Sequence, residues 1–338
     1  MSLTARFAAL AVISLALCGS GNAQAQRSSG QVSRPGMPSE SVLRERINRW
    51  TVGLAGGLLE GAPIRLATEI ARVVNDGENL HVLPIVTRGP TENVNDLLYL
   101  KGVDLAIISS DTLEEYKSQV PNIQQRLSYI LNLFPSELHI FARPEIRSLQ
   151  DLAGKKVNFN TQGTAAAFSG PLILSRLGIE VDKMFIPHPV ALEQMRRGEV
   201  SAVVFITSKP IDAFLKGRWD GGFKFLPVSY DARFEDYYLP TSLNSTDYPS
   251  LIASGERVDT IAVPTILVAY NWRNNTDRYQ RAARFVDHLF NRIDKLQAPG
   301  FDAKWKDINL NAKVPGLERF RPAQDWLNAN AAKVGVRP

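Results

Sequence analysis

The stretch from residue 80 to 111 constrains the fold most, because it places a helix between two short apolar runs. Residues 81–86 and 103–108 have the length and composition of buried strands. Between them, residues 91–100 carry apolar side chains at helical spacing. Two strands joined by a helical crossover form a parallel unit. The stretch therefore predicts a parallel sheet covered by helices.

The loops that follow these two strands are the first candidate site. Residues 87–93 follow the first strand, and residues 109–111 follow the second. In open parallel sheets, ligands bind beyond the carboxyl ends of the strands. Because these ends meet at one edge of a sheet, we expect both loops to face one cleft.

The rest of the chain predicts two α/β lobes, each with a mostly parallel sheet flanked by helices. A second, similar half begins near residue 148, and residues 259–270 return to the first lobe as one or two strands. Pro264 argues for an edge strand or a bend there, and Arg143-Pro144 marks the crossing between lobes. The predicted first lobe contains residues 48–142 and 236–338, and the second contains residues 143–235. The last 40 or so residues cannot be placed.

The beginning of the chain has the pattern of a cleavable signal peptide. Arg6 precedes a short apolar run at residues 7–17, and Ala23-Gln-Ala25 matches a cleavage site. We therefore expect residues 1–25 to be removed and the mature chain to start at Gln26. The alternative is lipid attachment at Cys18, disfavoured by the bulky Leu17. Residues 26–47, rich in Ser, Arg, Gly and Pro, predict a flexible leader.

Composition and motifs exclude several classes of protein. The formal charge is only +5, and the basic residues are scattered, which argues against nucleic-acid binding. Cys18 is the only cysteine, so cleavage after Ala25 leaves neither disulfides nor thiolate metal sites. The four histidines are widely spaced, and no nucleophile, base and orienting group form a set. We expect an exported, soluble protein without a cofactor, a metal or catalytic residues.

Arg88 is the sharpest candidate in the first-lobe loop. It precedes a helix, whose first backbone N–H groups and positive dipole end favour an anion. Its guanidinium can hold a carboxylate through two parallel hydrogen bonds. The alternative is a surface arginine paired with Glu92. Asn93 in the same loop can contact a ligand or act as a local capping residue.

Residues 160–165 form the corresponding loop of the second lobe. Thr164 can cap the following helix, and the backbone amides of Gly163 to Ala165 can hold an anion. Capping alone is the alternative. Residues 109–111 can likewise offer hydroxyl contacts or cap the next helix, and residues 207–209 are a less certain part of the site.

Several motifs, in order, resemble one known family. They are Trp50-Thr-Val-Gly-Leu-Ala-Gly-Gly57, Thr87-x-Gly-x-x-Glu-Asn93, Val103-Asp-Leu-Ala-Ile-Ile-Ser-Ser-Asp111, Leu138-x-Ile-x-Ala-Arg143, Leu149-x-Asp-Leu-x-Gly-Lys-Lys-Val157 and Gly198-x-Val-x-Ala-Val-Val-Phe205. The series is similar to the TAXI family, the extracytoplasmic solute-binding subunits of TRAP transporters. The resemblance implies a two-lobed periplasmic-binding-protein fold of the second type. It also implies a small organic anion, such as an amino acid or dicarboxylate, and a membrane permease partner.

The sequence departs from the family pattern in two loops. Residues 58–63 stand where small polar and aromatic residues are usual, and Thr87-Arg-Gly-Pro90 replaces a Thr-Gly-Gly-Ser loop. These changes leave the fold expectation intact and put the choice of ligand in doubt. The candidate ligand-binding residues are Gly56, Gly57, Leu58, Glu60, Arg88, Gly89, Asn93, Ser109, Ser110, Asp111, Asn160, Gln162, Gly163, Thr164, Ala165, Phe205 and Thr207.

The sequence thus predicts a monomeric periplasmic protein that captures a small organic anion for a TRAP-type transporter. Lobe closure around the ligand is the expected mechanism. A ligand-binding module of the same fold that signals to a membrane sensor is the second hypothesis. An enzyme of unknown type is the third.

Overall fold

The computed structural model describes residues 38–59, 61–77 and 79–331. The residues from Glu40 onward form one compact unit. The predicted signal peptide, the Cys18 alternative and Glu60 lie outside the described residues. Helix α1 spans Glu40–Arg49, so part of the predicted leader is helical. This helix buries none of its side chains.

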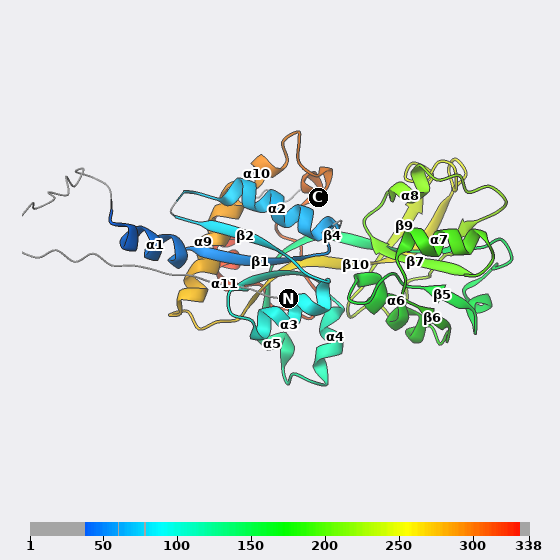
Figure 1. Ribbon diagram of the computed structural model, residues 1–338, viewed down its shortest axis with the longest axis horizontal. Coiled ribbons are helices and arrows are strands. Elements are labelled where there is room, and N and C mark those ends of the chain that lie inside the picture. The colour runs from blue at the N-terminus through cyan, green and yellow to red at the C-terminus, as the bar shows by residue number, and fades with distance from the viewer. Residues whose placement is uncertain (1–37, 60, 78, 332–338) are drawn as a thin grey trace, which may run out of the picture. The chain divides into compact units, whose positions relative to one another are not determined.

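The first lobe is built on the predicted parallel unit (Figure 1). Strands β2 (His81–Val86) and β3 (Leu105–Ser109) both pair in parallel with β1 (Thr51–Gly57), which lies between them. Helices α2 (Ala62–Val74) and α3 (Pro90–Tyr99) make the crossovers. The apolar side chains of α2 recur at helical spacing and are buried. The carboxyl ends of all three strands therefore open towards the same side.

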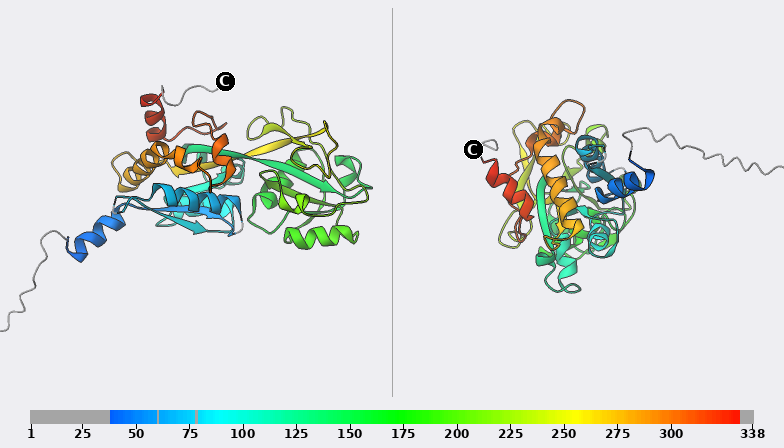
Figure 2. Two further views of the ribbon diagram at one scale, coloured as in Figure 1. Left: turned by 90° about the horizontal axis from the view of Figure 1, so that it is seen from above. Right: turned by 90° about the vertical axis from the view of Figure 1, so that its left-hand side faces the viewer.

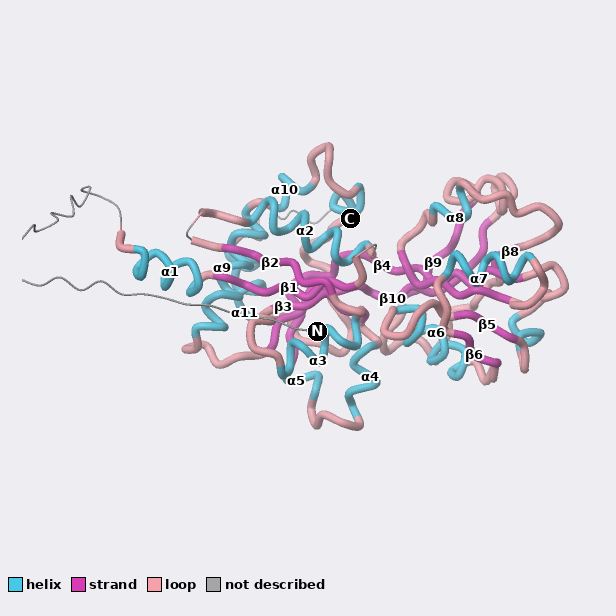
Figure 3. The backbone as a smooth tube through the Cα atoms, viewed as in Figure 1, coloured by secondary structure: helices cyan, strands magenta, loops and turns pink. Residues whose placement is uncertain are grey.

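Two long antiparallel strands, β4 (Leu127–Ala142) and β10 (Arg257–Tyr270), run through both lobes (Figure 3). The apolar runs at residues 127–134 and 138–142 predict two separate strands, whereas β4 is one strand. Strand β10 is central, between β3 and β4, so the expectation that Pro264 marks an edge is wrong. Pro264 lies opposite Pro135 of β4. Pairing with β3 ends at Thr265, so Pro264 is not required to donate a ladder hydrogen bond there.

The second lobe repeats the parallel arrangement. Strands β5 (Lys156–Asn158), β6 (Asp182–Met184) and β7 (Ala202–Thr207) are parallel, in the order β7-β5-β6, and β7 pairs antiparallel with β4. Helices α6 (Ala165–Arg176) and α7 (His188–Arg196) follow β5 and β6. All the strands belong to one 10-stranded sheet. The predicted two-lobed α/β class, consistent with the second type of periplasmic-binding-protein fold, is confirmed.

Short elements complete the chain between these strands. The 3-10 helix η1 (Leu149–Leu152) begins after Ser148, which forms a capping box with Asp151. The other short elements are α4 (Thr112–Lys117), α5 (Ile123–Arg126), α8 (Asp212–Leu215), β8 (Lys224–Phe225) and β9 (Leu239–Asn244). Strand β8 pairs with β4, and β9 pairs with β10.

Each lobe has its own apolar core. Leu131 and Phe134 of β4 pack in a first-lobe cluster, whereas Leu138 and Ile140 of the same strand pack in a second-lobe cluster. Strand β4 therefore passes from one core to the other before it reaches Arg143. Tyr248, which follows β9, packs with second-lobe side chains. The exact lobe bounds drawn from the sequence stay a prediction.

The end of the chain, which the sequence left unplaced, covers the first-lobe core (Figure 2). Trp305 is 1% exposed and its indole N–H donates to the Glu69 carboxylate of α2 at 2.6 Å. Phe320 and Leu327 belong to the same cluster. The elements here are η2 (Ala303–Asp307) and α11 (Arg321–Ala329), which follow α9 (Asp277–Asn291) and α10 (Ile293–Leu296).

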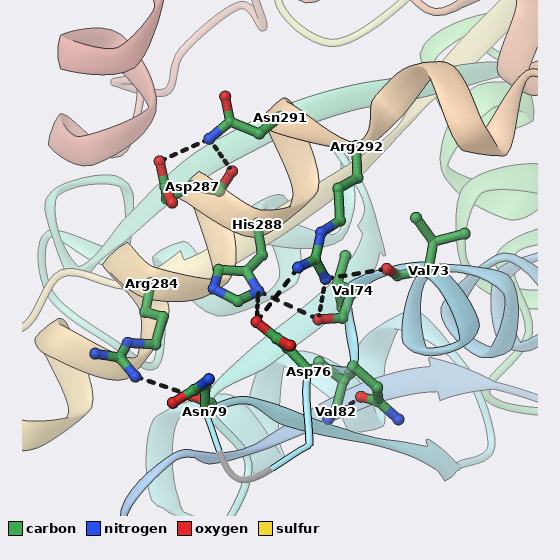
Figure 4. A network of polar contacts seen from close by, with 11 residues as sticks. Val73, Val74, Asp76, Asn79, Val82, Arg284, Asp287, His288, Asn291 and Arg292 are labelled. Atoms are coloured by element: carbon green, nitrogen blue, oxygen red, sulfur yellow. Dashed lines mark hydrogen bonds and ion pairs between the residues drawn. The ribbon is translucent and has the colours of Figure 1, made fainter.

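The Arg292 side chain, which follows α9, closes the C-terminal end of α2 (Figure 4). The Arg292 guanidinium donates to the carbonyls of Val73 and Val74, at 3.3 and 3.1 Å, and to Asp76 at 3.3 Å. The last carbonyls of a helix lack intrahelical partners and carry the negative end of its dipole. Arg292 donates hydrogen bonds to these carbonyls and places a positive charge at the negative end of the dipole. It also ties α9 to the loop before β2.

Candidate ligand-binding cleft

A cavity of about 650 Å³ lies between the two lobes. Its first-lobe wall contains the loops after β1 and β2 and the end of β3. Its second-lobe wall contains the start of α6, the start of α7 and the end of β7. Phe134 and Ser136 of β4 and Thr265 of β10 also line it. The predicted position at the carboxyl ends of the strands is therefore where the cavity is found.

The predicted residues divide between those that line the cavity and those that support it. Ligand contact by any of them stays a prediction. The lining group is Gly56, Gly57, Leu58, Arg88, Gly89, Ser109, Asn160, Thr164, Ala165, Phe205 and Thr207. Outside the lining are Asn93, Ser110, Asp111, Gln162 and Gly163.

Arg88 lies in the lining, but its side chain is 78% exposed and pairs with Glu92, with 3.4 Å between Nε and Oε2. The Glu92 carboxylate also accepts the backbone N–H of Arg88, and this bond is the main cause that lowers the pKa of Glu92. The surface pairing considered in the sequence analysis is thus present. An exposed pair of this kind contributes little to stability.

Asn93 is fully buried and joins the ends of the first-lobe strands. Its side-chain amide donates to the carbonyls of Gly56 and Ile107, at 3.0 and 2.7 Å, and its oxygen accepts the hydroxyl of Thr87. All the hydrogen-bonding groups of this side chain have partners within the lobe. Asn93 therefore holds the loops of the cavity wall in place without lining the cavity itself.

Residues 109–111, at the end of β3, also divide between lining and support. Ser109 lines the cavity, whereas the Ser110 hydroxyl donates to the carbonyl of Tyr237 at 3.0 Å. Asp111 is fully buried and accepts the Tyr238 hydroxyl at 3.0 Å. Burial raises the pKa of Asp111 to about 6. These contacts fix the segment before β9 against the first lobe.

In the second lobe, Thr164 caps α6 as its position predicted. Its hydroxyl oxygen accepts the backbone N–H of Ala167 at 3.2 Å, and the hydroxyl donates to the carbonyl of Thr161 at 2.8 Å. Asn160 has a positive φ of 64°. Thr164 thus caps α6, and the backbone at the start of α6 also borders the cavity.

The candidate loops of the two lobes touch at Gly89 and Gly163. A Cβ built on Gly89 would lie 2.2 Å from the carbonyl oxygen of Gly163. Both glycines also have φ values in the left-handed region, 129° and 87°. Only a residue without a side chain allows this close approach of the two backbones.

His188 was not predicted as a site residue, yet it lines the cavity. Its ring stacks on Phe205, with 3.6 Å between centroids and 25° between planes. Its Nε2–H donates to the carbonyl of Val204 at 2.9 Å. The flanking prolines 187 and 189, at the start of a helix, were the only sequence signal for a fixed ring at this place.

Four helices begin at the cavity. Lining residues include Pro63 at the start of α2, Pro90 of α3, Ala165 of α6 and His188 of α7. Helix N-termini carry a partial positive charge, which favours an anion. Arg88 is the only Arg or Lys side chain in the described lining, and no described Asp or Glu lines it. Backbone dipoles are therefore the main cationic contribution to this cavity from the described residues.

A second hollow, of about 450 Å³, lies where α9 meets the loop after α2 (Figure 4). It is lined by Trp50, Asp76, Asn79, Arg284 and His288, among others. Arg284 stacks over Trp50, with its Cζ 3.5 Å from the ring centroid, and donates to the carbonyl of Asn79 at 3.1 Å. These groups satisfy one another and hold α9 in place, so the interlobe cavity is the better candidate.

Among the described residues, no three or more His, Cys, Asp or Glu side chains come together in a way that suits a metal ion. Within the same residues, no helix combines the length and apolar character needed to cross a membrane.

Comparison with known proteins identifies one matching family and many similar folds. The sequence model of the NMT1-like family matches residues 63–298. Solved structures that resemble the chain include YhfZ from Shigella flexneri, at 16% identity and a TM-score of 0.44, covering 77% of this chain and 97% of that one. The BvgS VFT2 domain of Bordetella pertussis is 15% identical, with a TM-score of 0.43, and the match covers 80% of this chain and 98% of that one. A mutant ArgBP from T. maritima is 18% identical, with a TM-score of 0.41, and the match covers 75% of this chain and 94% of that one.

Proposed function

The chain belongs to the NMT1-like family, whose sequence model spans residues 63–298, and from this premise we propose that it is a solute-binding protein for a small organic anion. One observation carries the proposal: a cavity of about 650 Å³ between two lobes, bordered by the N-termini of four helices. Such a volume suits a small organic molecule. The helix ends favour negative charge without a buried cationic side chain.

The proposed mechanism is lobe closure around the ligand. The two lobes are joined by β4 and β10, whose pairing includes Pro135 opposite Pro264. Because neither proline has an N–H, this rung lacks the usual ladder donors and is a suitable place for bending. A ligand that contacts both walls shifts the equilibrium towards the closed form. The contact between the Gly89 and Gly163 loops belongs to that closed form.

The finer assignment is to the TAXI-type subunits of TRAP transporters, acting in the periplasm as a monomer. The ordered motifs between Trp50 and Phe205 support it. The closed form would then be recognised by a membrane permease. The second candidate is a ligand-binding module for a membrane sensor. A neighbouring permease gene would favour transport, and a neighbouring sensor-kinase gene would favour signalling. We propose no enzymatic activity.

The decisive experiment measures carried solute and closure on the same mature protein. Native mass spectrometry of gently purified protein should show a bound small anion that is lost on denaturation. Small-angle scattering should then give a smaller radius of gyration with that solute than after its removal. An absent solute together with a profile that no candidate ligand changes would refute solute binding by closure.

A further inference from the structure

The described lining of the interlobe cavity is mostly apolar. Its polar side chains are chiefly hydroxyl groups, those of Ser109, Ser136, Thr161, Thr164, Thr207 and Thr265. Two of these hydroxyls already satisfy each other, because Ser136 Oγ and Thr265 Oγ1 lie 2.8 Å apart. The apolar part of the lining includes Leu58, Ile107, Ile108, Phe134, Phe205 and Ile206. A ligand here meets apolar surface over most of its body.

The charged side chains of the described lining offer few partners to a ligand with two charged groups. An α-ammonium group needs carboxylate or several free acceptors, and no described lining residue is Asp or Glu. A second carboxylate needs a second cationic partner, and the only guanidinium in the described lining is that of Arg88, which is 78% exposed and paired with Glu92. A single carboxylate, by contrast, can be placed at the helix N-termini.

One wall of the cavity is an ordered aromatic stack. Phe214 meets Phe205 edge to face at 5.2 Å, and Phe205 stacks with His188 at 3.6 Å between centroids. Phe205 is only 5% exposed, so its ring is covered. His188 is half-buried and is the outermost ring of the stack. Its remaining face is the aromatic surface available to a ligand.

The His188 ring is fixed in orientation and in protonation. Its Nε2–H donates to the carbonyl of Val204, and Pro187 and Pro189 limit the backbone on both sides. Burial lowers the pKa of His188 to about 4, so the ring is neutral at pH 7. A neutral, fixed ring offers stacking at low entropic cost and offers no charge to a second carboxylate.

We propose that this cavity selects an organic monocarboxylate with a planar, largely apolar body, and that this body stacks on the outer face of His188. The proposal rests on the proposed solute-binding function and narrows its ligand class. It departs from the amino acid or dicarboxylate that the family resemblance implies. His188 is then a specificity-determining residue.

Calorimetric titration of the mature protein, freed of carried solute, tests the ligand class. Benzoate and indole-3-acetate serve as planar monocarboxylates, L-glutamate as the zwitterionic ligand and succinate as the dicarboxylate. We expect at least one planar monocarboxylate to bind tenfold or more tightly than either of the others. Binding of glutamate or succinate with no binding of the planar acids would overturn the ligand class and leave solute binding intact.

Variants of His188 test the stacking surface with the planar acid that binds most tightly. His188→Ala should weaken its binding tenfold or more, and His188→Phe should restore most of it, because Phe keeps a planar ring. Val190→Ala is the control, since Val190 lies on the same helix as His188, is 48% exposed and is outside the cavity lining. Melting curves of each variant separate binding loss from unfolding. Equal affinity in His188→Ala and the unmodified protein would remove His188 from recognition.

The outcomes also separate the two levels of the proposal. If none of the four probes binds but native mass spectrometry finds a carried solute of another class, the inference about the ligand fails alone. If no probe binds, no solute is carried and the scattering profile never changes, the solute-binding function fails with it.

Discussion

The two walls of the interlobe cavity are built differently. The first-lobe wall is mainly loop backbone, with Leu59 and Arg88 exposed, and its supporting groups such as Asn93 lie behind it. The second-lobe wall consists of side chains that are themselves locked, Phe205 in an aromatic cluster and His188 on top of it. If the proposed function is correct, the second-lobe wall is preorganised to recognise the ligand. In the proposed mechanism, the first-lobe wall then closes over it.

Removing the centre of the aromatic wall should give the largest effect. Phe205→Ala deletes a ring that is 5% exposed and packed between Phe214 and His188. A cavity of this kind costs about 3–5 kcal/mol of unfolding free energy. Urea unfolding followed by circular dichroism measures it. The matched change on the other wall, Leu59→Ala, should stay within about 0.5 kcal/mol. Similar losses for both variants would contradict the proposed asymmetry.

A buried acid behind the first-lobe wall should have the next largest effect, and it depends on pH. The folded pKa of Asp111 is raised to about 6 by burial, above its usual value. The folded state therefore binds the proton more tightly, so this stabilisation is present below about pH 4 and is lost as the pH rises through about 6. The loss is on the order of 3 kcal/mol.

Comparing Asp111→Asn with the unmodified protein at pH 4 and pH 7 isolates this contribution. The unfolding free energy of the unmodified protein should fall relative to that of the variant as the pH rises. His188, on the other wall, should change the unfolding free energy with pH in the opposite direction. Its pKa is lowered to about 4, so its contribution is lost as the pH falls from about 6.5 towards 4. A difference between protein and Asn variant that does not change with pH would show that Asp111 titrates normally.

Loss of a helix cap should lower the unfolding free energy by less than the changes at Phe205 and Asp111, and the two walls differ in this respect too. Thr164 caps α6 with its side chain, whereas Gly89 at the start of α3 makes no side-chain cap. Thr164→Ala should lower the unfolding free energy by about 1 kcal/mol, and Thr164→Ser should retain most of it. Denaturant unfolding of the two variants checks this. Equal stability of Ala and Ser at this position would remove the cap from the account.

Arg88 should give the smallest effect. Its side chain is 78% exposed and paired with Glu92. Arg88→Ala should change the unfolding free energy by less than about 0.5 kcal/mol and the affinity for a bound carboxylate by less than about tenfold. Thermal unfolding and titration of the same sample measure both. A larger loss of affinity with unchanged stability would restore the carboxylate clamp suggested by the sequence.

Local patterns predicted the parallel unit well, because each of its signals is short-range. Strand β2 starts and ends where the apolar run does, and Gly89 and Pro90 interrupt the chain after it. The sequence predicted two strands in place of β4, because Pro135 on its own indicates a break in the strand. Only the partner strand, with Pro264 opposite, shows that the pairing continues. Trp305 was unplaced for the same reason, since its partner Glu69 is far away in sequence.

The site was predictable at the level of loops and less so at the level of side chains. Strand ends located the loops, but Ser109 lines the cavity while Ser110 is held by Tyr237. That choice depends on the direction of each side chain and on a distant segment. His188 could not be found from its residue type, because a histidine with a backbone partner has the same sequence signature whether or not it borders a cavity.

The position of β10 between β3 and β4 also sets the order in which the chain can fold. During synthesis, β1 to β3 are complete long before β10 exists, and β3 consists entirely of buried residues. Its edge stays unpaired until the second lobe has been made, and an unpaired apolar edge invites association with other chains. We expect the first lobe to finish folding last, and its long-range pairing to make that step slow. Chaperones that act on this protein would therefore have most to protect in its earliest strands.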